Sequence, residues 1–469
     1  MIKKVFSHSI IYAIGPQLPK IVGFFLLPFL TPHLSKTDFG VWGTIVAYSL
    51  IFSSARDLGM VVPMFNSYYK HPTRWIWVWR QVIWYLLLWG IVIAIFQSLL
   101  LYVVIPDEAL SDRPEIILLL AVQCVFFDVP ILIGSRYYQA AEKPFAISIV
   151  SILSGFIAVG GQYYFIAVKS MGYMGWFYAT FSSLAIMAFI YAVLLYKMRL
   201  IPLARIRLRW AAARFKVALP MVPHSYSAYM LNASDRVMLS AFNTPISQIG
   251  LYNVAYMWGN YLEVIGNSIG MAVGPIYLKL YNEPQNSGLL IAKRITILLQ
   301  LLFIVGSFIV SLWSKELFTI FIRNQSLTEA YSLAIIIVMS YSYRPLYWSV
   351  ITKLQFDEKT SKLWRISFAA GAINILLNFI FIPLYGFQAA AYTTFVAMMY
   401  QGFAGYFLKN QNHSFNRFEL MFWFIFIIIA TTMAFSLREV SIEIKFILTC
   451  AILLVVFIWG FRFSKKIKV

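Results

Sequence analysis

Residues 82–105 read VIWYLLLWGIVIAIFQSLLLYVVI, without a single Asp, Glu, Lys or Arg. A helix that crosses the hydrocarbon core of a bilayer needs about 20 mostly apolar residues, and this segment meets that requirement. It therefore predicts a transmembrane helix, and similar stretches recur along the whole chain.

The composition agrees with this interpretation. The chain has 469 residues, of which 61% are hydrophobic and 12% charged, with a mean hydropathy of +0.76. A soluble protein has about 25% charged residues, and a disordered one is poor in apolar residues, so both classes are excluded. Cys124 and Cys450 lie in apolar runs, which predicts two small buried side chains and no disulfide framework.

The apolar stretches predict an all-α polytopic membrane protein with about 14 transmembrane helices. The connections are short, and the longest is the basic stretch near 197–216. The first stretch reads as a retained span without a cleavage site. The candidate spans are 9–30, 41–65, 82–105, 115–136, 145–168, 172–196, 217–241, 249–275, 289–313, 329–352, 363–383, 387–408, 418–437 and 443–462.

The basic residues behind the net charge of +20 are distributed unequally between the two sides of the membrane. With a cytoplasmic N-terminus, 27 Lys and Arg fall on the cytoplasmic side, 7 on the outer side and 4 inside spans. Cytoplasmic loops carry an excess of Lys and Arg, so both termini are expected in the cytoplasm. The basic excess is therefore a topology signal, and no fold for reading nucleic acid accompanies it.

An internal repeat divides the chain. FGVWGTIVAYSL at 39–50 resembles IGLYNVAYMWGN at 249–260, and GYMGWFYATF at 172–181 resembles GFQAAAYTTF at 386–395, at offsets of 210 and 214. One shift thus relates spans 1–6 to spans 7–12. Because six is even, the halves have the same orientation, as in transporters built from two lobes about a pseudo-twofold axis. The expected parts are an N-lobe at 1–196, a basic cytoplasmic linker at 197–216, a C-lobe at 217–408, and two further helices with a basic tail at 409–469.

Eight ionisable residues fall within the predicted spans. Each costs about 2.5–3.5 kcal/mol at a helix centre, so they must be paired, face a wet interior or lie near the interface. Amides such as Asn374 and Asn378 also suit a wet interior. A structural role stays open for several of them. The candidates are Lys20, Arg56, Arg236 and Arg344 for substrate or cavity contacts, and Asp57, Asp128, Asp235 and Glu263 as counter-ions or coupling groups.

Several signatures of catalysis are missing from the sequence. The histidines show no metal-ligand spacing, and no phosphate-binding loop of the Walker type occurs. Large extracytoplasmic loops, which a membrane glycan polymerase or ligase would use, are absent as well. We therefore expect a protein without metal or cofactor that is not an enzyme.

Four segments carry a family resemblance. LLPFLTPHLSKTDFGVWGT at 26–44, DLGMVVPMFNSYYK at 57–70, NASDRVMLSAF at 232–242 and NILLNFIFIPLYGFQAAAYTTF at 374–395 resemble the bacterial polysaccharide-biosynthesis flippases. These are the O-antigen and capsule lipid-linked oligosaccharide transporters of the multidrug/oligosaccharidyl-lipid/polysaccharide exporter superfamily.

The resemblance implies a two-lobed helical bundle in the bacterial inner membrane that works by alternating access. Its implied substrate is an undecaprenyl-pyrophosphate-linked oligosaccharide, moved from the cytoplasmic to the periplasmic leaflet. Its implied partners are membrane lipids and the polysaccharide polymerase machinery. A lipid II flippase and a cation-coupled multidrug exporter of the same superfamily remain alternatives.

Overall fold

The computed structural model of the chain describes residues 17–71, 73–204, 208–219, 222–282, 286–408 and 415–464. Within these ranges the secondary structure is helical and contains no strand, so the all-α prediction is confirmed there. Eight of the described helical segments are long and apolar enough to cross a membrane. They are Trp75–Val104, Arg113–Ala140, Pro144–Val168, Met174–Lys197, Gly288–Leu312, Lys362–Tyr385, Arg417–Glu439 and Ile442–Trp459.

The chain forms two compact units. Unit 1 comprises the described residues within Met1–Ser240 and Pro245–Gly250, and unit 2 those within Ala241–Thr244 and Leu251–Val469. The helices from the predicted span at 217–241 thus pack mainly with unit 1.

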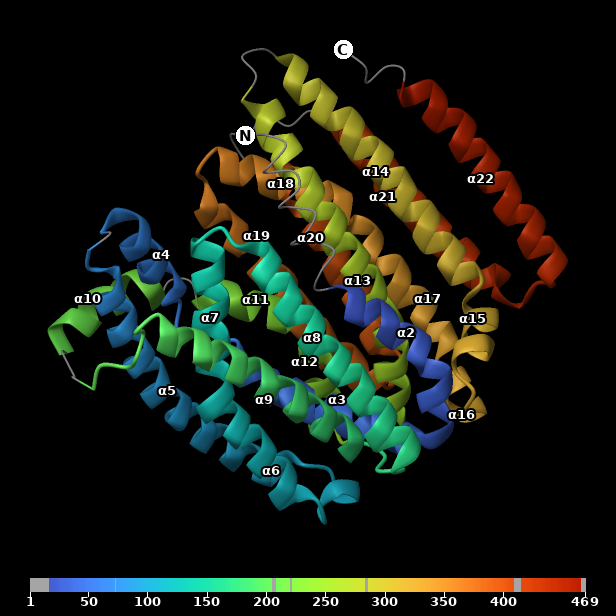
Figure 1. Ribbon diagram of the computed structural model, residues 1–469. Coiled ribbons are helices and arrows are strands. Elements are labelled where there is room, and N and C mark those ends of the chain that lie inside the picture. The colour runs from blue at the N-terminus through green and yellow to red at the C-terminus, as the bar shows by residue number, and fades with distance from the viewer. Residues whose placement is uncertain are drawn as a thin grey trace. The chain divides into compact units, whose positions relative to one another are not determined.

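Unit 1 is built from long helices and several short ones (Figure 1). The helices α8 and α9 lie side by side along their length, and α2 packs against α8. The elements are α2 (Leu18–Leu30), α3 (Lys36–Ser53), α4 (Val61–Lys70), α5 (Trp75–Val104), α6 (Arg113–Val122), the π-helix η4 (Gln123–Phe127), α7 (Asp128–Ala140), α8 (Pro144–Gln162), the π-helix η5 (Tyr163–Val168), α9 (Met174–Lys197), α10 (Leu208–Ala218), α11 (Val222–Asn232) and α12 (Ser234–Ala241).

Unit 2 is organised around α14, α17, α19 and α20, which pack on one another in neighbouring pairs. The long helix α13 begins in unit 1 and continues into unit 2. The elements are α13 (Ile246–Tyr281), α14 (Asn286–Leu312), α15 (Ser314–Phe321), α16 (Gln325–Thr328), α17 (Tyr331–Ser340), the 3₁₀-helix η7 (Tyr341–Tyr343), α18 (Arg344–Phe356), α19 (Thr360–Tyr385), α20 (Ala389–Phe403), α21 (Arg417–Ser436) and α22 (Ile442–Ser464).

The motif Ser35–Gly40 forms the N-terminal end of α3. Ser35 is the N-cap, and its side chain accepts a hydrogen bond from the backbone N–H of Asp38 at 3.1 Å. The Asp38 carboxylate in turn accepts from the Ser35 N–H at 2.7 Å, which completes a capping box. The same carboxylate accepts from the Tyr173 N–H at 2.8 Å. These three bonds fix where α3 begins and tie it to the start of α9.

An aromatic and aliphatic core joins α4, α5 and α7 in unit 1. Trp79 is fully buried there and donates its indole N–H to the Met64 carbonyl at 3.0 Å. Ile133 and Tyr137 of α7 belong to the same cluster. Burial of apolar area at about 25 cal/mol per Å² is the main stabilising contribution of such a cluster. It holds α4, α5 and α7 in the positions that the site below requires.

Candidate functional site

The chain is irregular between α3 and α4, from Ser54 to Met60. The sequence analysis expects one span over 41–65, and the structure interrupts it. Leu58 and Gly59 take positive φ values of 47° and 70°, which end a helix. The Asp57 carboxylate accepts the Gly59 N–H at 3.0 Å and so closes the turn. Irregular backbone at membrane depth is tolerated where protein buries it or where it lines a wet cavity.

Two neighbouring helices hold this break in place. Trp89 of α5 donates its indole N–H to the Ala55 carbonyl at 3.0 Å. At Gly59, a Cβ would lie 2.1 Å from the Ala218 carbonyl oxygen at the end of α10. Only glycine fits that close approach, and glycine also tolerates the positive φ without steric cost. The sequence Asp57-Leu58-Gly59 therefore builds the break, and α5 and α10 position it.

Arg56 extends from the break to Asp128, and the two side chains form an ion pair with Nη1 and Oδ2 2.6 Å apart. Asp128 is the first residue of α7 and directly follows the π-helix Gln123–Phe127. Such π-bulges are frequent at functional sites. The side chains of Arg56 and Asp128 are 21% and 17% exposed, so the pair is only partly shielded.

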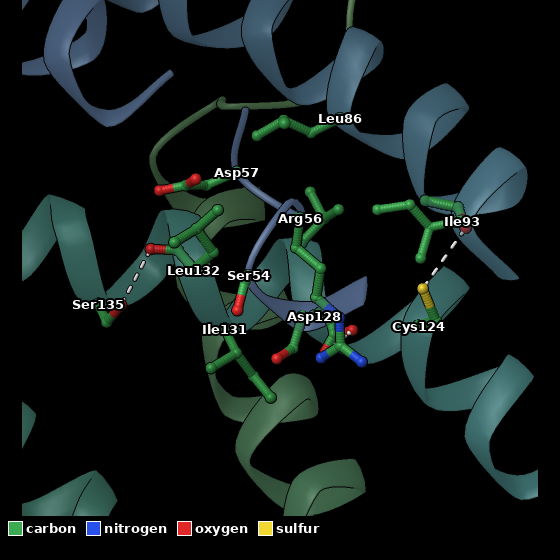
Figure 2. A pocket seen from close by; sticks show the side chains of 13 residues that line it. Ser54, Arg56, Asp57, Leu86, Ile93, Cys124, Asp128, Ile131, Leu132 and Ser135 are labelled. Atoms are coloured by element: carbon green, nitrogen blue, oxygen red, sulfur yellow. Dashed lines mark hydrogen bonds and ion pairs between the residues drawn. The ribbon is translucent and has the colours of Figure 1, made fainter. Parts of the chain in front are cut away.

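A cavity of about 350 Å³ opens beside this pair (Figure 2). The guanidinium of Arg56 lies next to Asp128, whereas the Asp57 carboxylate points to another side. The lining of the cavity is largely apolar, and its polar groups are the serine hydroxyls, the Arg56 guanidinium and the carboxylates of Asp57 and Asp128. The lining residues are Ser53, Ser54, Arg56, Asp57, Leu86, Gly90, Ile93, Cys124, Asp128, Val129, Ile131, Leu132 and Ser135. A second cavity of about 170 Å³ shares Ser53 and Arg56 with the first.

The guanidinium of Arg56 has spare hydrogen-bonding capacity. Its Nε is buried and forms no hydrogen bond within the described part of the chain. Arginine carries five N–H donors in a planar fork that matches the oxygens of a carboxylate or phosphate. A buried donor without a partner is costly, by about 1–3 kcal/mol. The site is thus suited to accept an anionic oxygen group in addition to Asp128, or in place of it.

Unit 2 contains a second ion pair at Arg344, the first residue of α18. Its Nη2 lies 3.1 Å from Oε1 of Glu263, and its Nη1 donates to Oδ1 of Asn267 at 2.8 Å. The guanidinium carbon lies 5.1 Å and 5.9 Å from the ring centroids of Tyr341 and Tyr343. Arg344 is 8% exposed. Its Nε, like that of Arg56, is buried without a hydrogen-bond partner among the described residues, but Arg344 contacts more protein side chains than Arg56 does.

In each of the two ion pairs, one member directly follows a short helix that is not α-helical. That member is the anion Asp128 in unit 1 and the cation Arg344 in unit 2. Asp128 follows the π-helix η4, and Arg344 follows the 3₁₀-helix η7, so each stands directly after a departure from α-helix. The partner comes from the break after α3 for Asp128 and from α13 for Arg344. In both units an ion pair thus stands where a helix departs from α-helical geometry.

The other predicted residues lie elsewhere in unit 1. Lys20 is exposed in the first turn of α2, and the part of its predicted span before residue 17 lies outside the described residues. Asp235 is fully buried in α12. Arg236 is 7% exposed and donates from Nη1 to the Asn232 carbonyl at 2.9 Å. Both Asp235 and Arg236 make further contacts. These three residues do not line the cavity beside Arg56.

The charged residues that lie at these two ion pairs are named by the sequence analysis, but the aromatic residues that contact them or hold the break are not. The residues missed are Trp89, which holds the break, and Tyr341 and Tyr343, which flank Arg344. The Asp57-Leu58-Gly59 turn was detectable in principle, since Asp and Gly favour such turns. No sequence signal marks the π-helix before Asp128.

No family model and no curated protein matches the chain. Among solved structures, it is similar to the lipid II flippase MurJ in an inward closed conformation. The TM-score is 0.75 at 13% identity, over 97% of this chain and 99% of that one.

It is also similar to a multidrug resistance MATE family transporter of the MOP superfamily. The inward-facing form gives a TM-score of 0.59 at 12% identity, over 90% of this chain and 99% of that one. The outward-facing form gives 0.58 at 14% identity, over 91% and 96%. At these identities the likeness concerns the fold alone. With eight apolar spans among the described residues, the chain is a multi-pass membrane protein.

Proposed function

We propose that the protein is a flippase for undecaprenyl-pyrophosphate-linked oligosaccharide repeat units. It would move them from the cytoplasmic to the periplasmic leaflet of the bacterial inner membrane by alternating access, for O-antigen or another surface polysaccharide. The observation that carries the proposal is the partly paired Arg56 guanidinium, which lines a cavity at the break between α3 and α4. Discontinuous helices of this kind form the substrate sites of many transporters.

The proposed architecture has fourteen spans in two six-helix lobes, with two additional C-terminal helices. The proposed parts are an N-lobe at 1–196, a linker at 197–216, a C-lobe at 217–408 and a C-terminal part at 409–469, with both termini in the cytoplasm. The charge distribution supports this orientation. Transport in this scheme breaks and forms no covalent bond, so the protein acts without enzymatic chemistry or a cofactor.

We propose different roles for the eight predicted site residues, according to the contacts that each one makes. Arg56 is proposed as the main contact for the pyrophosphate, because it lines the cavity and its Nε forms no hydrogen bond among the described residues. Asp128 is its counter-ion and competes with the phosphate for the same fork. Asp57 shapes the break. Lys20, which is exposed, is proposed as a further contact for an anionic headgroup. Asp235 and Arg236 are proposed to maintain the helices of unit 1, and Arg344 and Glu263 those of unit 2.

Two alternatives rest on particular observations. The similarity to the lipid II flippase extends over 97% of this chain, which favours lipid II as a second substrate candidate. Both candidates carry a pyrophosphate, so Arg56 would serve either. The similarity to multidrug transporters and the carboxylates Asp57 and Asp128 in the cavity favour a cation-coupled exporter.

The deciding experiment is depletion of the protein in the bacterium that produces it. Accumulation of lipid-linked oligosaccharide on the cytoplasmic leaflet, with normal cell-wall synthesis, is the expected result. Rescue of cells that lack their lipid II flippase would instead identify lipid II as the substrate. Drug resistance on expression, with no lipid-linked intermediate accumulating on depletion, would overturn the flippase proposal in favour of the exporter.

A further inference from the structure

The helix α10 displays one exposed stripe of side chains. Its exposed residues are Arg209, Ala212, Ala213 and Lys216, at the helical spacing i, i+3, i+4 and i+7. Arg209 and Lys216 make no ion pair within the described part of the chain. The two cations therefore lie about 10 Å apart along the helix axis, and the two small alanine side chains lie between them. This leaves room for a small anionic group between them.

The opposite side of α10 is fixed to the helix α5 by aromatic rings. The Trp210 ring lies 5.6 Å from Trp77 in an edge-to-face arrangement and 5.9 Å from Tyr85 in a stacked one. Phe215 lies 6.4 Å from Tyr85. Such aromatic pairs each contribute about 0.5–1.5 kcal/mol beyond their buried area. The helix is therefore held with its Arg209–Lys216 stripe outward.

Further exposed cations lie at the same end of unit 1. Lys70 ends α4 and Arg74 precedes α5, and both are exposed. The helix α10 packs against α4, so these cations belong to elements next to α10 (Figure 1). Trp and Tyr side chains next to basic residues are typical of the membrane–water interface. We use the name α10 surface for the exposed residues Lys70, Arg74, Arg209 and Lys216.

We propose that the α10 surface binds the phosphate headgroups of anionic phospholipids in the cytoplasmic leaflet. Because the aromatic side of α10 packs on α5, the cationic stripe would contact lipid headgroups through its charge alone. The cytoplasmic leaflet carries anionic lipids that attract such basic segments. The proposal rests on the cytoplasmic orientation proposed above, and it does not depend on which substrate is transported.

This surface connects directly to the break that carries Arg56. Ala218 is the last residue of α10. Its carbonyl oxygen is so close to Gly59 that a Cβ on Gly59 would lie only 2.1 Å from it. A displacement of α10 therefore changes the backbone next to Arg56, because packed backbone atoms cannot interpenetrate. Anionic lipid on α10 would thus stabilise the present form of the site.

The test uses the full-length protein with Ala212→Cys and Cys450→Ser, labelled with a fluorophore in bilayer nanodiscs. The remaining Cys124 is 1% exposed, and a protein without Ala212→Cys reports its background labelling. Quenching by spin-labelled phosphatidylglycerol is compared with quenching by spin-labelled phosphatidylcholine. We expect preferential quenching by phosphatidylglycerol, which falls by about fivefold for each cation removed in Arg209→Gln and Lys216→Gln.

The matched control is Lys279→Gln with Arg365→Gln, which removes the same charge from exposed residues of unit 2. This control should leave the preference for phosphatidylglycerol unchanged. Equal quenching by both lipids, or a preference that persists in the Arg209→Gln/Lys216→Gln protein, would overturn the proposal. A membrane-impermeant thiol reagent should label Ala212→Cys in inverted vesicles. Labelling in right-side-out vesicles instead would refute the cytoplasmic placement without touching the lipid selectivity measured in nanodiscs.

Discussion

Gly40 and Gly250 are in mutual contact at the first turns of α3 and α13. A Cβ on Gly40 would lie 2.0 Å from the Ile246 carbonyl oxygen, and a Cβ on Gly250 would lie 1.8 Å from the Lys36 carbonyl oxygen. Each glycine thus approaches the first residue of the other helix. The contact is reciprocal, and its members are separated by the offset of 210 found between the two sequence segments. A reciprocal contact between repeat-related residues is the pattern expected at a local twofold axis.

Gly40→Ala or Gly250→Ala should destabilise the protein by about 1–3 kcal/mol or more, because the atoms that the new methyl group meets belong to backbone and cannot rotate away. The measurement is the midpoint of thermal unfolding of the purified protein in detergent. Gly160→Ala and Gly306→Ala are matched controls, since nothing lies within 4 Å of a Cβ at either position. They should stabilise their helices by about 0.5–1 kcal/mol. Equal effects at all four positions would contradict the close-contact explanation.

Arg344→Met should destabilise unit 2 by about 3–5 kcal/mol, because it leaves the Glu263 carboxylate without its cation. Adding Glu263→Gln should recover most of the loss, since the remaining amide needs no counter-charge. Unfolding free energies of the two single variants and the double variant measure this coupling. Purely additive losses would show that Arg344 and Glu263 do not depend on each other.

Asp57→Ala should impair the break through the lost hydrogen bond to the Gly59 N–H, which is worth about 1 kcal/mol. Asp57→Asn keeps an acceptor oxygen and should behave like the original protein in stability and in transport. The comparison is made at equal expression, with export of surface polysaccharide as the readout. Loss of transport in Asp57→Asn would show instead that the charge of Asp57 is required, as expected for a coupling group.

A carboxylate outside the spans gives a pH prediction. Burial tends to raise the pKa of Asp357, but Lys353 at 2.8 Å and Lys359 at 3.4 Å outweigh it, so this pKa is lowered. A lowered folded-state pKa contributes stability above the unfolded value of about 3.9, and this is lost as the pH falls through the folded value. Asp357→Asn should therefore reduce stability slightly at neutral pH and have no effect in strong acid. A difference that grows on acidification would contradict the pairing.

The sequence predicts features that depend on local composition, such as apolar membrane spans. It predicts fewer of the features that depend on how helices pack, such as the surroundings of a polar side chain. Segments such as 82–105 identify spans because hydrocarbon selects for apolar residues irrespective of neighbours. Asn374 and Asn378, by contrast, suit a wet interior by residue type alone. In the structure they are fully buried, and Asn378 donates to Asn374 while Asn374 donates to Thr394 of α20. An amide facing a neighbouring helix and one facing water have the same local sequence.

The candidate site shows the same limit. That Arg56 and Asp128 need partners follows from the cost of charge in the membrane. That they are each other's partner depends on the break at Asp57–Gly59 and on the π-helix before Asp128, which together set the direction of both side chains. Pairing of residues from different helices is a property of tertiary packing, so a single sequence names the charges and leaves the pairs open.

The double variant Arg56→Gln/Asp128→Asn gives the sharpest test of the anion site. Arg56→Gln alone would leave Asp128 buried without a cation and could fail to fold, whereas the double variant exchanges the ion pair for two neutral amides. It should fold at the original yield and lose transport, because no fork remains for a phosphate. Asp128→Asn alone removes the competitor of the phosphate, so it should lower the KM of transport. The measurement is uptake of a lipid-linked oligosaccharide by proteoliposomes. Full transport by a folded double variant would exclude Arg56 as the pyrophosphate contact.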